Sequence, residues 1–237
     1  AALFPDARIA RLDSDTAQNR NYEKETIREF SKGNIDILIG TQMVSKGFDF
    51  SNLSLVAVIA ADSLLGMQDF RADERAHQLL QQLRGRCGRR ARRGTFMIQT
   101  ANAEHPVYQN ITENRPDFCT SLLTERKDFN FPPYTRIVEI NIKDNIEDRG
   151  KRMSEKLALK LRGQFVSGGA SLLDDPITGP YSPTVDRVAD QYIKTIRLSL
   201  KKDRNLTYGK ETLKKTISAF EKENRYDGHI TINVDPS

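Results

Sequence analysis

Nearly uninterrupted apolar runs constrain the fold of this chain more than any other feature. They are IDILIGT at 35–41 and LSLVAVIAAD at 53–62, and GTFMIQT at 94–100 is a third run of this kind. A strand that is buried on both faces reads as a continuous apolar run, as in parallel sheets that are covered by helices. The first part of the chain is therefore predicted to be an α/β layer with a parallel sheet.

Helical patterns alternate with these strands. After a short strand at 9–13, Tyr22, Ile27 and Phe30 recur at helical spacing, and Gly33 supplies a stop. A second helix, which starts near position 71, carries one apolar face. Its members are Ala72, Ala76, Leu79, Leu80 and Leu83.

Composition excludes several classes of protein. The chain has 237 residues and a net charge of +5, and no apolar run approaches the roughly 20 residues that span a bilayer. The first residues do not have the pattern of a signal peptide. Two cysteines, Cys87 and Cys119, cannot build a disulfide framework, and with three histidines they argue against a structural zinc site. We expect a cytoplasmic protein without a membrane partner and without a metal site in this chain.

Positive charge is concentrated in one segment. No acidic residue occurs between Glu74 and Glu104, and the stretch 84–93 is rich in arginine. Such a cluster lies in solvent or against a polyanion. Its arginines are Arg84, Arg86, Arg89, Arg90, Arg92 and Arg93.

Loop residues follow the predicted strands at their carboxyl ends, where open α/β sheets bind ligands. The strand at 35–41 runs into GTQMVSKGFDF at 40–50, and the strand at 53–62 ends in Asp62. For any single residue here, an ordinary loop role is the simpler explanation. No segment matches a Walker A loop, so the chain alone cannot cradle a triphosphate and supplies at most half of a nucleotide site.

An ordered set of motifs identifies a family resemblance. The segment 82–89, QLRGRCGR, has the form Q-x-x-G-R-x-G-R and resembles motif VI of superfamily 2 helicases, while 40–50 resembles their motif V. The segment 69–80, DFRADERAHQLL, makes the resemblance specific to the primosomal helicase (PriA) family. Three later elements agree with that family: FPPY at 131–134, GPYSP at 179–183 and VDP at 234–236.

The resemblance implies roles for particular residues. Arg89 would be the arginine finger that faces ATP from another lobe, assisted by Arg86 and Gln82, because a guanidinium binds phosphate oxygens bidentately. The expected nucleotide-contacting residues are Asp49, Gly47 and Gly85. The expected DNA-contacting residues are Thr41, Lys46, Arg84, Arg92 and Arg93.

Two positions depart from the family pattern. Position 84 is usually small in the family and here is Arg84, and position 87 is usually alanine and here is Cys87. A further guanidinium beside the finger leaves the assignment open between Arg84, Arg86 and Arg89. Cys87 is interpreted as a packed residue, because no base is patterned near it.

The second half has a different pattern. A helical stretch from His105 to Lys127 is interrupted at Pro116, and Pro132-Pro133 marks a boundary. Its expected packing residues are Val107, Ile111, Phe118, Leu122 and Leu123. Beyond the boundary come a strand at 134–143, a helix at 147–162, strands near 177–188 and 191–200, a helix around 213–220 and a strand at 229–234. This β-α-β-β-α-β order predicts a ferredoxin-like split unit.

Basic residues of this half are interpreted in two ways, as a phosphate-binding or acidic-peptide-binding hairpin edge, or as charges that protect an edge strand from aggregation. They are Arg187, Lys194, Arg197, Lys201, Lys202 and Arg204. Tyr181 and Tyr192 are expected either to stack on bases or to pack.

The resemblance implies an organisation and a function. Residues 1–103 would form the second RecA-like helicase lobe, 104–131 a helical connector, and 132–237 a small α+β domain that binds DNA and partners. The intact protein would be an ATP-dependent DNA helicase of replication restart, with single-strand DNA-binding protein and other primosome proteins as partners. ATP and Mg would be held mainly by a first lobe, and Zn by cysteines upstream of Ala1.

Two alternatives stay open from the sequence. One is another superfamily 2 DNA translocase, such as a RecG-like fork remodeller. The other is a nucleic-acid-binding module without catalysis, built on a helicase lobe.

Overall fold

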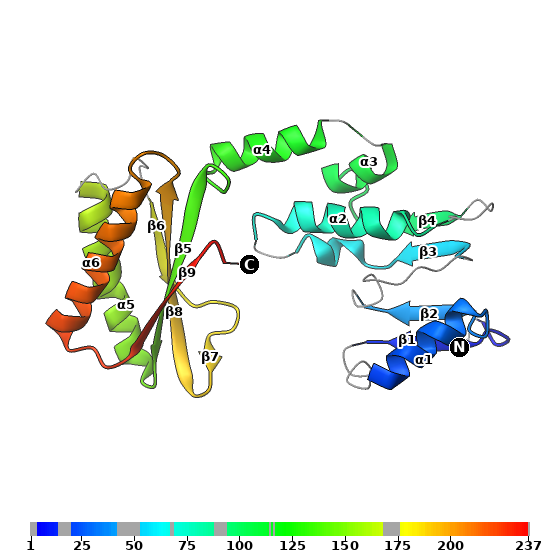
Figure 1. The fold of residues 1–237 in the computed structure, drawn as a ribbon, viewed down its shortest axis with the longest axis horizontal. Helices are drawn as coiled ribbons and strands as arrows, with labels where there is room; N and C mark the ends of the chain where they lie inside the picture. Colours follow the sequence, from blue (N-terminus) through cyan, green and yellow to red (C-terminus); the bar gives the residue numbers. More distant parts are fainter. Residues whose placement is uncertain are drawn as a thin grey trace. The chain divides into compact units, whose positions relative to one another are not determined.

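The computed structural model divides into two compact units, Ala1–Cys119 and Thr120–Ser237. Figure 1 shows the elements of both. The residues described are 4–13, 20–41, 53–66, 69–87, 94–113, 115, 117–167 and 176–236. The unit boundary falls inside the segment 104–131 that the sequence assigned to a helical connector, and the predicted domain boundaries stay predictions.

Parallel strand pairs form the sheets of the first unit, as the apolar runs predicted. Strand β1 (Ile9–Leu12) pairs with β2 (Ile37–Gly40), and β3 (Leu55–Val58) pairs with β4 (Thr95–Ile98). Among the described residues these are two separate two-stranded sheets. Each strand is shorter than the apolar run that predicted it. After β3, Ala60 adopts a left-handed backbone conformation with φ of 51° and leads into the 3-10 turn η3 (Ala61–Leu64).

Helices connect these strands where the helical spacing predicted them. Helix α1 (Arg20–Ser31) is followed by Gly33, whose φ of +80° and N–H bond to the Phe30 carbonyl complete the expected stop. Helix α2 (Ala72–Arg84) runs from the carboxyl end of β3 towards the amino end of β4. Its predicted apolar face is confirmed, with Ala72, Ala76 and Leu80 buried.

Two further helices follow β4. They are α3 (Pro106–Glu113) and α4 (Phe118–Asp128), and Pro116 between them lies outside the described residues. Three of the expected packing residues are buried: Val107, Ile111 and Phe118. Leu123 was expected to pack and is instead 43% exposed. Helix α4 therefore has a weaker apolar face than its sequence suggested.

The second unit has the predicted order of elements. Its elements are β5 (Thr135–Asp144), α5 (Glu147–Arg162), the π-helical turn η4 (Gly163–Ser167), β6 (Ile177–Tyr181), β7 (Arg187–Val188), β8 (Gln191–Lys201), α6 (Leu206–Asn224) and β9 (His229–Val234). The main strands lie in the order β6-β8-β5-β9, all neighbours antiparallel. This is the arrangement of a ferredoxin-like split unit.

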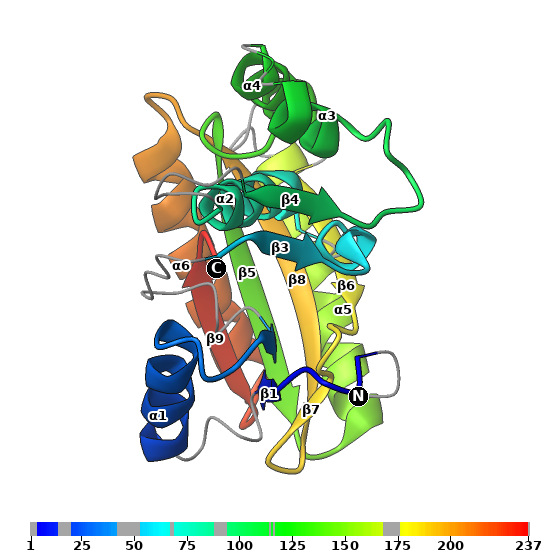
Figure 2. The same ribbon diagram turned by 90° about the vertical axis from the view of Figure 1, so that its right-hand side faces the viewer.

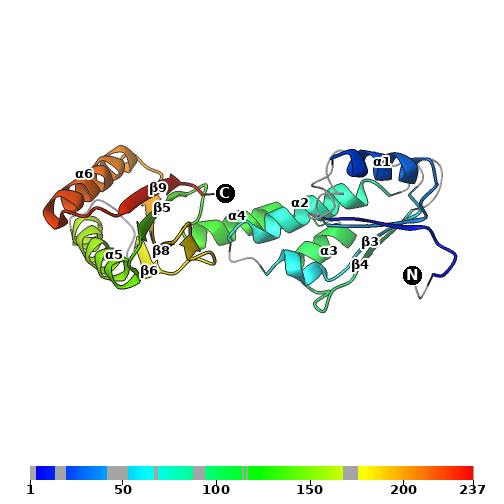
Figure 3. The same ribbon diagram turned by 90° about the horizontal axis from the view of Figure 1, so that it is seen from below.

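Both helices of this unit cover the same face of its sheet, as Figures 1 and 3 show. The strand face towards them is apolar, because cross-strand partners such as Ile140 and Ile196 share one side of the sheet. These residues and Leu157, Leu161 and Phe165 are completely buried, and they form one core. The helical faces and the strand alternation predicted this core.

Strand β8 lies inside the sheet, with β5 on one side and β6 on the other (Figure 2). The idea that its basic residues line a hairpin edge is therefore wrong for Lys194, Arg197 and Lys201. The sequence pointed to an edge because β8 follows the short strand β7 in a hairpin. The strand pairing that encloses β8 involves β5, which is more than 50 residues away, as in the pair Asn141–Thr195 with a separation of 54.

Candidate functional site

Helix α2 positions the described part of the arginine motif. Gln82 lies in its last turn, Gly85 is its C-cap, and the Gly85 N–H donates to the Gln81 carbonyl at 2.9 Å. The Arg86 N–H then donates to the Leu83 carbonyl at 3.1 Å, which continues the helix by a tighter turn. Gln82 is exposed and Arg86 is half-buried. Arg89, Arg92 and Arg93 lie outside the described residues, so their roles stay predictions.

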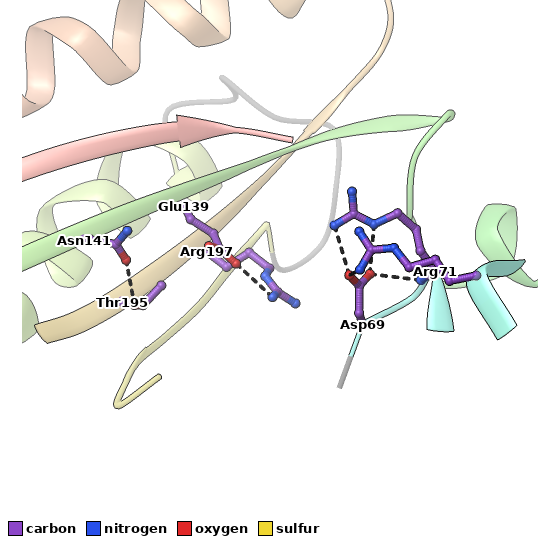
Figure 4. Close-up of polar contacts among 7 residues, drawn as sticks. Asp69, Arg71, Glu139, Asn141, Thr195 and Arg197 are labelled. Carbon is purple, nitrogen blue, oxygen red and sulfur yellow. Dashed lines mark hydrogen bonds and ion pairs between the residues drawn. The ribbon is translucent and has the colours of Figure 1, made fainter. Parts of the chain in front are cut away.

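The start of α2 is fixed by an acidic residue of the DFRA-x-ER element (Figure 4). The Asp69 carboxylate accepts hydrogen bonds at 3.0 Å from the Arg71 N–H and from two nitrogens of its guanidinium, and Arg75 lies 3.1 Å away. Burial would raise the pKa of Asp69, but these bonds outweigh it and lower the pKa. The motif therefore braces the helix that ends at the arginines.

The middle and end of α2 contact α3. The His77 ring bonds the Asn110 amide oxygen and stacks on Phe118, with 4.5 Å between ring centroids. One turn from the end of α2, the Arg84 guanidinium donates to the carbonyl of Ile111, in the last turn of α3. A cation at this place satisfies a free carbonyl and interacts favourably with the helix dipole.

Arg84 was predicted to bind DNA and was also a candidate for the finger. In this structure its guanidinium is engaged by α3, which gives the departure from a small residue at position 84 a structural explanation. The sequence offered no signal for this contact, because it joins residues 27 positions apart.

Gly85 does not owe its identity to the fold of this chain. Its φ is −65°, an ordinary helical value that alanine adopts. A Cβ atom built there would lie 3.4 Å from the Gln81 carbonyl oxygen and 3.6 Å from that of Gln82, which are ordinary contacts. The described surroundings therefore accept a side chain at this position.

Cys87 marks the edge of the sheet at which the motif lies. Its thiol is 3.4 Å from the carbonyl oxygen of Thr95, the first residue of β4, and burial raises the pKa of the thiol. A protonated, half-buried thiol agrees with the interpretation of Cys87 as a packing residue. The motif thus lies at the amino end of β4, although the sequence led us to look at the carboxyl ends.

Asp62 lies at the opposite, carboxyl edge. Its carboxylate accepts bonds from the Ala101 N–H at 2.8 Å, the Thr100 hydroxyl at 2.5 Å and the Tyr108 hydroxyl at 3.2 Å. These donors, the Ala101 N–H first among them, hold the pKa of Asp62 below its usual range. Asp62 joins the ends of β3 and β4 to α3, which supports the ordinary structural role.

Most of the motif V segment lies outside the described residues, including Lys46, Gly47 and Asp49. The described residue is Thr41, directly after β2. It is exposed, and its N–H donates to the Leu12 carbonyl at 3.3 Å. Its hydroxyl is therefore on the surface, as the predicted DNA contact requires.

In the second unit, the basic residues of β8 have partners within the sheet. Arg197 lies 3.1 Å from Glu139 on β5, and beside it Thr195 bonds Asn141 at 2.7 Å (Figure 4). Lys194 donates to the Ser182 hydroxyl at 2.8 Å. These contacts favour a structural role for the residues of β8. Lys202 and Arg204, just after the strand, are exposed.

The two tyrosines that were candidates for base stacking are both packed. Burial raises the pKa of Tyr181, whose ring lies against Gly179. The Arg187 guanidinium lies over the ring of Tyr192, 5.1 Å from its centroid. These contacts support the packing alternative.

Two searches of the described part of the chain were negative. None of its helices is long and apolar enough to cross a membrane. No group of three or more histidine, cysteine, aspartate or glutamate side chains is arranged there to hold a metal ion.

Comparisons with known proteins agree with the motif set. Residues 2–91 match the helicase conserved C-terminal domain, a RecA-like lobe. Several curated relatives carry the description "Replication restart protein PriA". The protein from Bacillus subtilis is 31% identical over 98% of this chain and 28% of its own length. That from Chlamydia trachomatis is 30% identical over 99% of this chain and 30% of its own length.

A third relative, from Synechocystis, is 35% identical over 80% of this chain. The chain spans 22% of this relative's length, and so corresponds to a minor part of each of the three proteins. The similarity extends through both compact units and includes the helicase motif segments. We conclude that the chain belongs to the PriA family of replication restart proteins.

Proposed function

We propose that this chain is the C-terminal part of an ATP-dependent replication-restart DNA helicase. The first unit would be the second motor lobe, and the second unit would contact forked or single-stranded DNA, single-strand DNA-binding protein and primosome partners. The observation that carries the proposal is the Q-x-x-G-R-x-G-R motif at the end of α2, in a chain similar to PriA proteins over both units. That extent of similarity favours this function over a RecG-like translocase or a degenerate lobe.

The described end of α2 fits a role towards nucleotide. Gln82 is exposed there, and Gly85 is a glycine that neither its φ nor its neighbours require. A glycine that the fold does not need is explained by the close approach of something outside the described residues. ATP and Mg would be bound mainly by the other motor lobe, with Asp49 and Gly47 contributing from this chain.

The arginines would act when charge develops on the γ-phosphate. Arg89, assisted by Arg86, would donate to its oxygens, since a planar guanidinium can bind two of them at once. Arginine fingers of this kind change rates by about 10³–10⁵-fold. Thr41, Lys46, Arg92 and Arg93 would neutralise DNA phosphates, and Zn would be bound elsewhere in the intact protein.

The test is Arg89→Ala in the intact helicase, measured by DNA-stimulated ATP hydrolysis and by DNA affinity. We expect hydrolysis to fall by about 10³-fold or more while DNA affinity is almost unchanged. Arg89→Lys should restore little, because an ammonium keeps the charge but not the fork. Full hydrolysis by Arg89→Ala would refute the finger assignment, and loss in Arg84→Ala instead would move the finger to Arg84.

A further inference from the structure

Strand β9 leaves one edge of the second unit's sheet open. It is the last strand in the order β6-β8-β5-β9, so only β5 pairs with it among the described strands. The Asp235 N–H donates to the Ile137 carbonyl at 2.7 Å, which sets the pattern of the ladder. Residues 229, 231 and 233 therefore bond inward, and Ile230, Ile232 and Val234 direct their N–H and C=O groups outward.

The other edge of this sheet is protected, and β9 is not. At β6 the register shifts between Thr178 and Tyr181, and Pro180 lacks an N–H. Strand β9, HITINV, contains no proline, lysine, arginine, aspartate or glutamate. Natural proteins protect free edges with such residues because a bare edge pairs with another strand.

The side chains of β9 also extend the apolar layer beyond the helices. Ile232 pairs with Ile140 and Val234 with Val138, so they point to the face that carries the core. Ile140 and Val138 are buried, whereas Ile232 is 44% exposed and Val234 is 53% exposed. A strand added at this edge would cover both.

We propose that β9 pairs with β9 of a second copy of this chain, antiparallel about a two-fold axis at Ile232. In this register Ile232 opposes its own copy, Ile230 opposes Val234, and Thr231 opposes Asn233. Each of the outward pairs exchanges two backbone hydrogen bonds. Apolar side chains meet apolar ones and polar side chains meet polar ones.

Self-complementarity is what selects a second copy as the occupant. An isologous interface needs a surface that matches itself under the two-fold rotation. A strand with a charge at its centre would oppose that charge with an identical one, and cross-strand like charges are destabilising. The centre of β9 is uncharged, and the ion pair of Asp235 with Arg136 holds its end. The inference does not depend on the proposed function.

The first test is the mass of the 237-residue chain by sedimentation, from about 1 µM to about 1 mM, a range suited to a small interface. We expect reversible dimerisation. Ile232→Lys should weaken it at least about tenfold, because lysine on an edge strand opposes pairing. Leu159→Lys is the matched control, since Leu159 lies on α5, is 68% exposed and is outside the edge; it should dimerise like the parent chain.

A cysteine variant tests the register and does not depend on the lysine variant folding. Opposed residues in a hydrogen-bonded antiparallel pair have Cα atoms about 5.5 Å apart, within disulfide reach. Ile232→Cys should therefore form a 232–232 disulfide, identified by peptide mapping against the native Cys87 and Cys119. Thr231→Cys should not, because its copies would be diagonal neighbours about 7–8 Å apart.

Three results would overturn the proposal. They are a parent chain that stays monomeric throughout the range, equal dimerisation of Ile232→Lys and Leu159→Lys, and a Thr231→Cys disulfide that forms as readily as that of Ile232→Cys. A monomer whose β9 is covered only when another protein is added would assign the edge to that protein's extended segment, and would also refute pairing between copies.

Discussion

The guanidinium of Arg84 donates to the main-chain carbonyl of Ile111, so the last turn of α2 is bonded to the last turn of α3. The same two helices are joined by the contact between His77 and Asn110. The helix that leads into the arginine motif is thus fixed to its neighbour along one face. An arginine in the middle of a phosphate-binding motif can therefore serve the fold of the lobe.

Arg84→Ala should reduce the free energy of unfolding of the first unit by about 1–2 kcal/mol, the usual contribution of a hydrogen bond from a charged group. Urea unfolding of the 237-residue chain measures it. Arg84→Lys keeps a cation at the end of α3 and should recover part of the loss. A variant with full stability and strongly reduced DNA affinity would instead restore Arg84 as a DNA contact.

Gly85→Ala should separate folding from function. Because φ and the Cβ position both suit alanine, thermal stability should be unchanged or raised, by at most about 1 kcal/mol. If nucleotide approaches this glycine closely, ATP hydrolysis by the intact helicase should fall at least about tenfold, which corresponds to about 1.4 kcal/mol.

Gly163→Ala is the matched control, because Gly163 is the C-cap of α5, has a φ of −57° and would place its Cβ in open space. It should change stability in the same direction and leave hydrolysis unaltered. Equal hydrolysis by the two variants would remove Gly85 from the site.

Asp144→Asn should make the second unit less stable at neutral pH. The Asp144 side chain is completely buried and accepts bonds from Arg149 at 2.8 Å and from the Ile146 N–H at 2.8 Å. Burial would raise the pKa of Asp144, but these bonds prevail and lower it. The variant should lose about 1–3 kcal/mol, measured by urea unfolding.

The pH dependence of this loss has a defined sign. A carboxyl whose pKa is lowered by folding stabilises the protein above its unfolded pKa of about 4, and the contribution disappears as the pH falls through the folded pKa. The difference between the parent chain and Asp144→Asn should therefore shrink below about pH 4. Asp227→Asn is the control, because Asp227 also pairs with Arg149 but is 77% exposed; its effect should be below about 1 kcal/mol at any pH.

The 237-residue chain should bind DNA weakly, with little sequence preference and a steep decrease in affinity as salt increases. Phosphate neutralisation releases counterions, so the logarithm of the binding constant falls linearly with the logarithm of salt concentration. Replacing Arg92 and Arg93 together by alanine should flatten this slope, whereas Arg84→Ala should leave it nearly unchanged. Fluorescence anisotropy with single-stranded and forked DNA measures both. Affinity that does not vary with salt would contradict the predicted contacts.

The same chain should show no DNA-stimulated ATP hydrolysis above that of its Arg89→Ala variant. It contains no Walker A loop, and an arginine finger without a phosphate cradle has no charge to stabilise. Hydrolysis clearly above that control would refute the interpretation of the chain as half of a nucleotide site.

Local patterns determined much of this protein. The continuous apolar runs predicted parallel strands, alternation in 191–200 predicted β8, and helical spacing placed α2 and α5, because burial imposes the period of each element directly on its residues. The arginine motif and the DFRA-x-ER element were enough to indicate the family. These signals are short in range, so they can be recognised in the sequence alone.

Only the tertiary structure decided which residues meet. The enclosure of β8 by β5, the bond of Arg84 to Ile111, the saturation of Asp62 by residues near position 100 and the open edge at β9 all depend on pairings between distant segments. The same arginine satisfies a phosphate or a helix carbonyl equally well, because both accept the same hydrogen bonds. The choice between them follows from where the chain places the acceptor, which residue type and spacing do not specify.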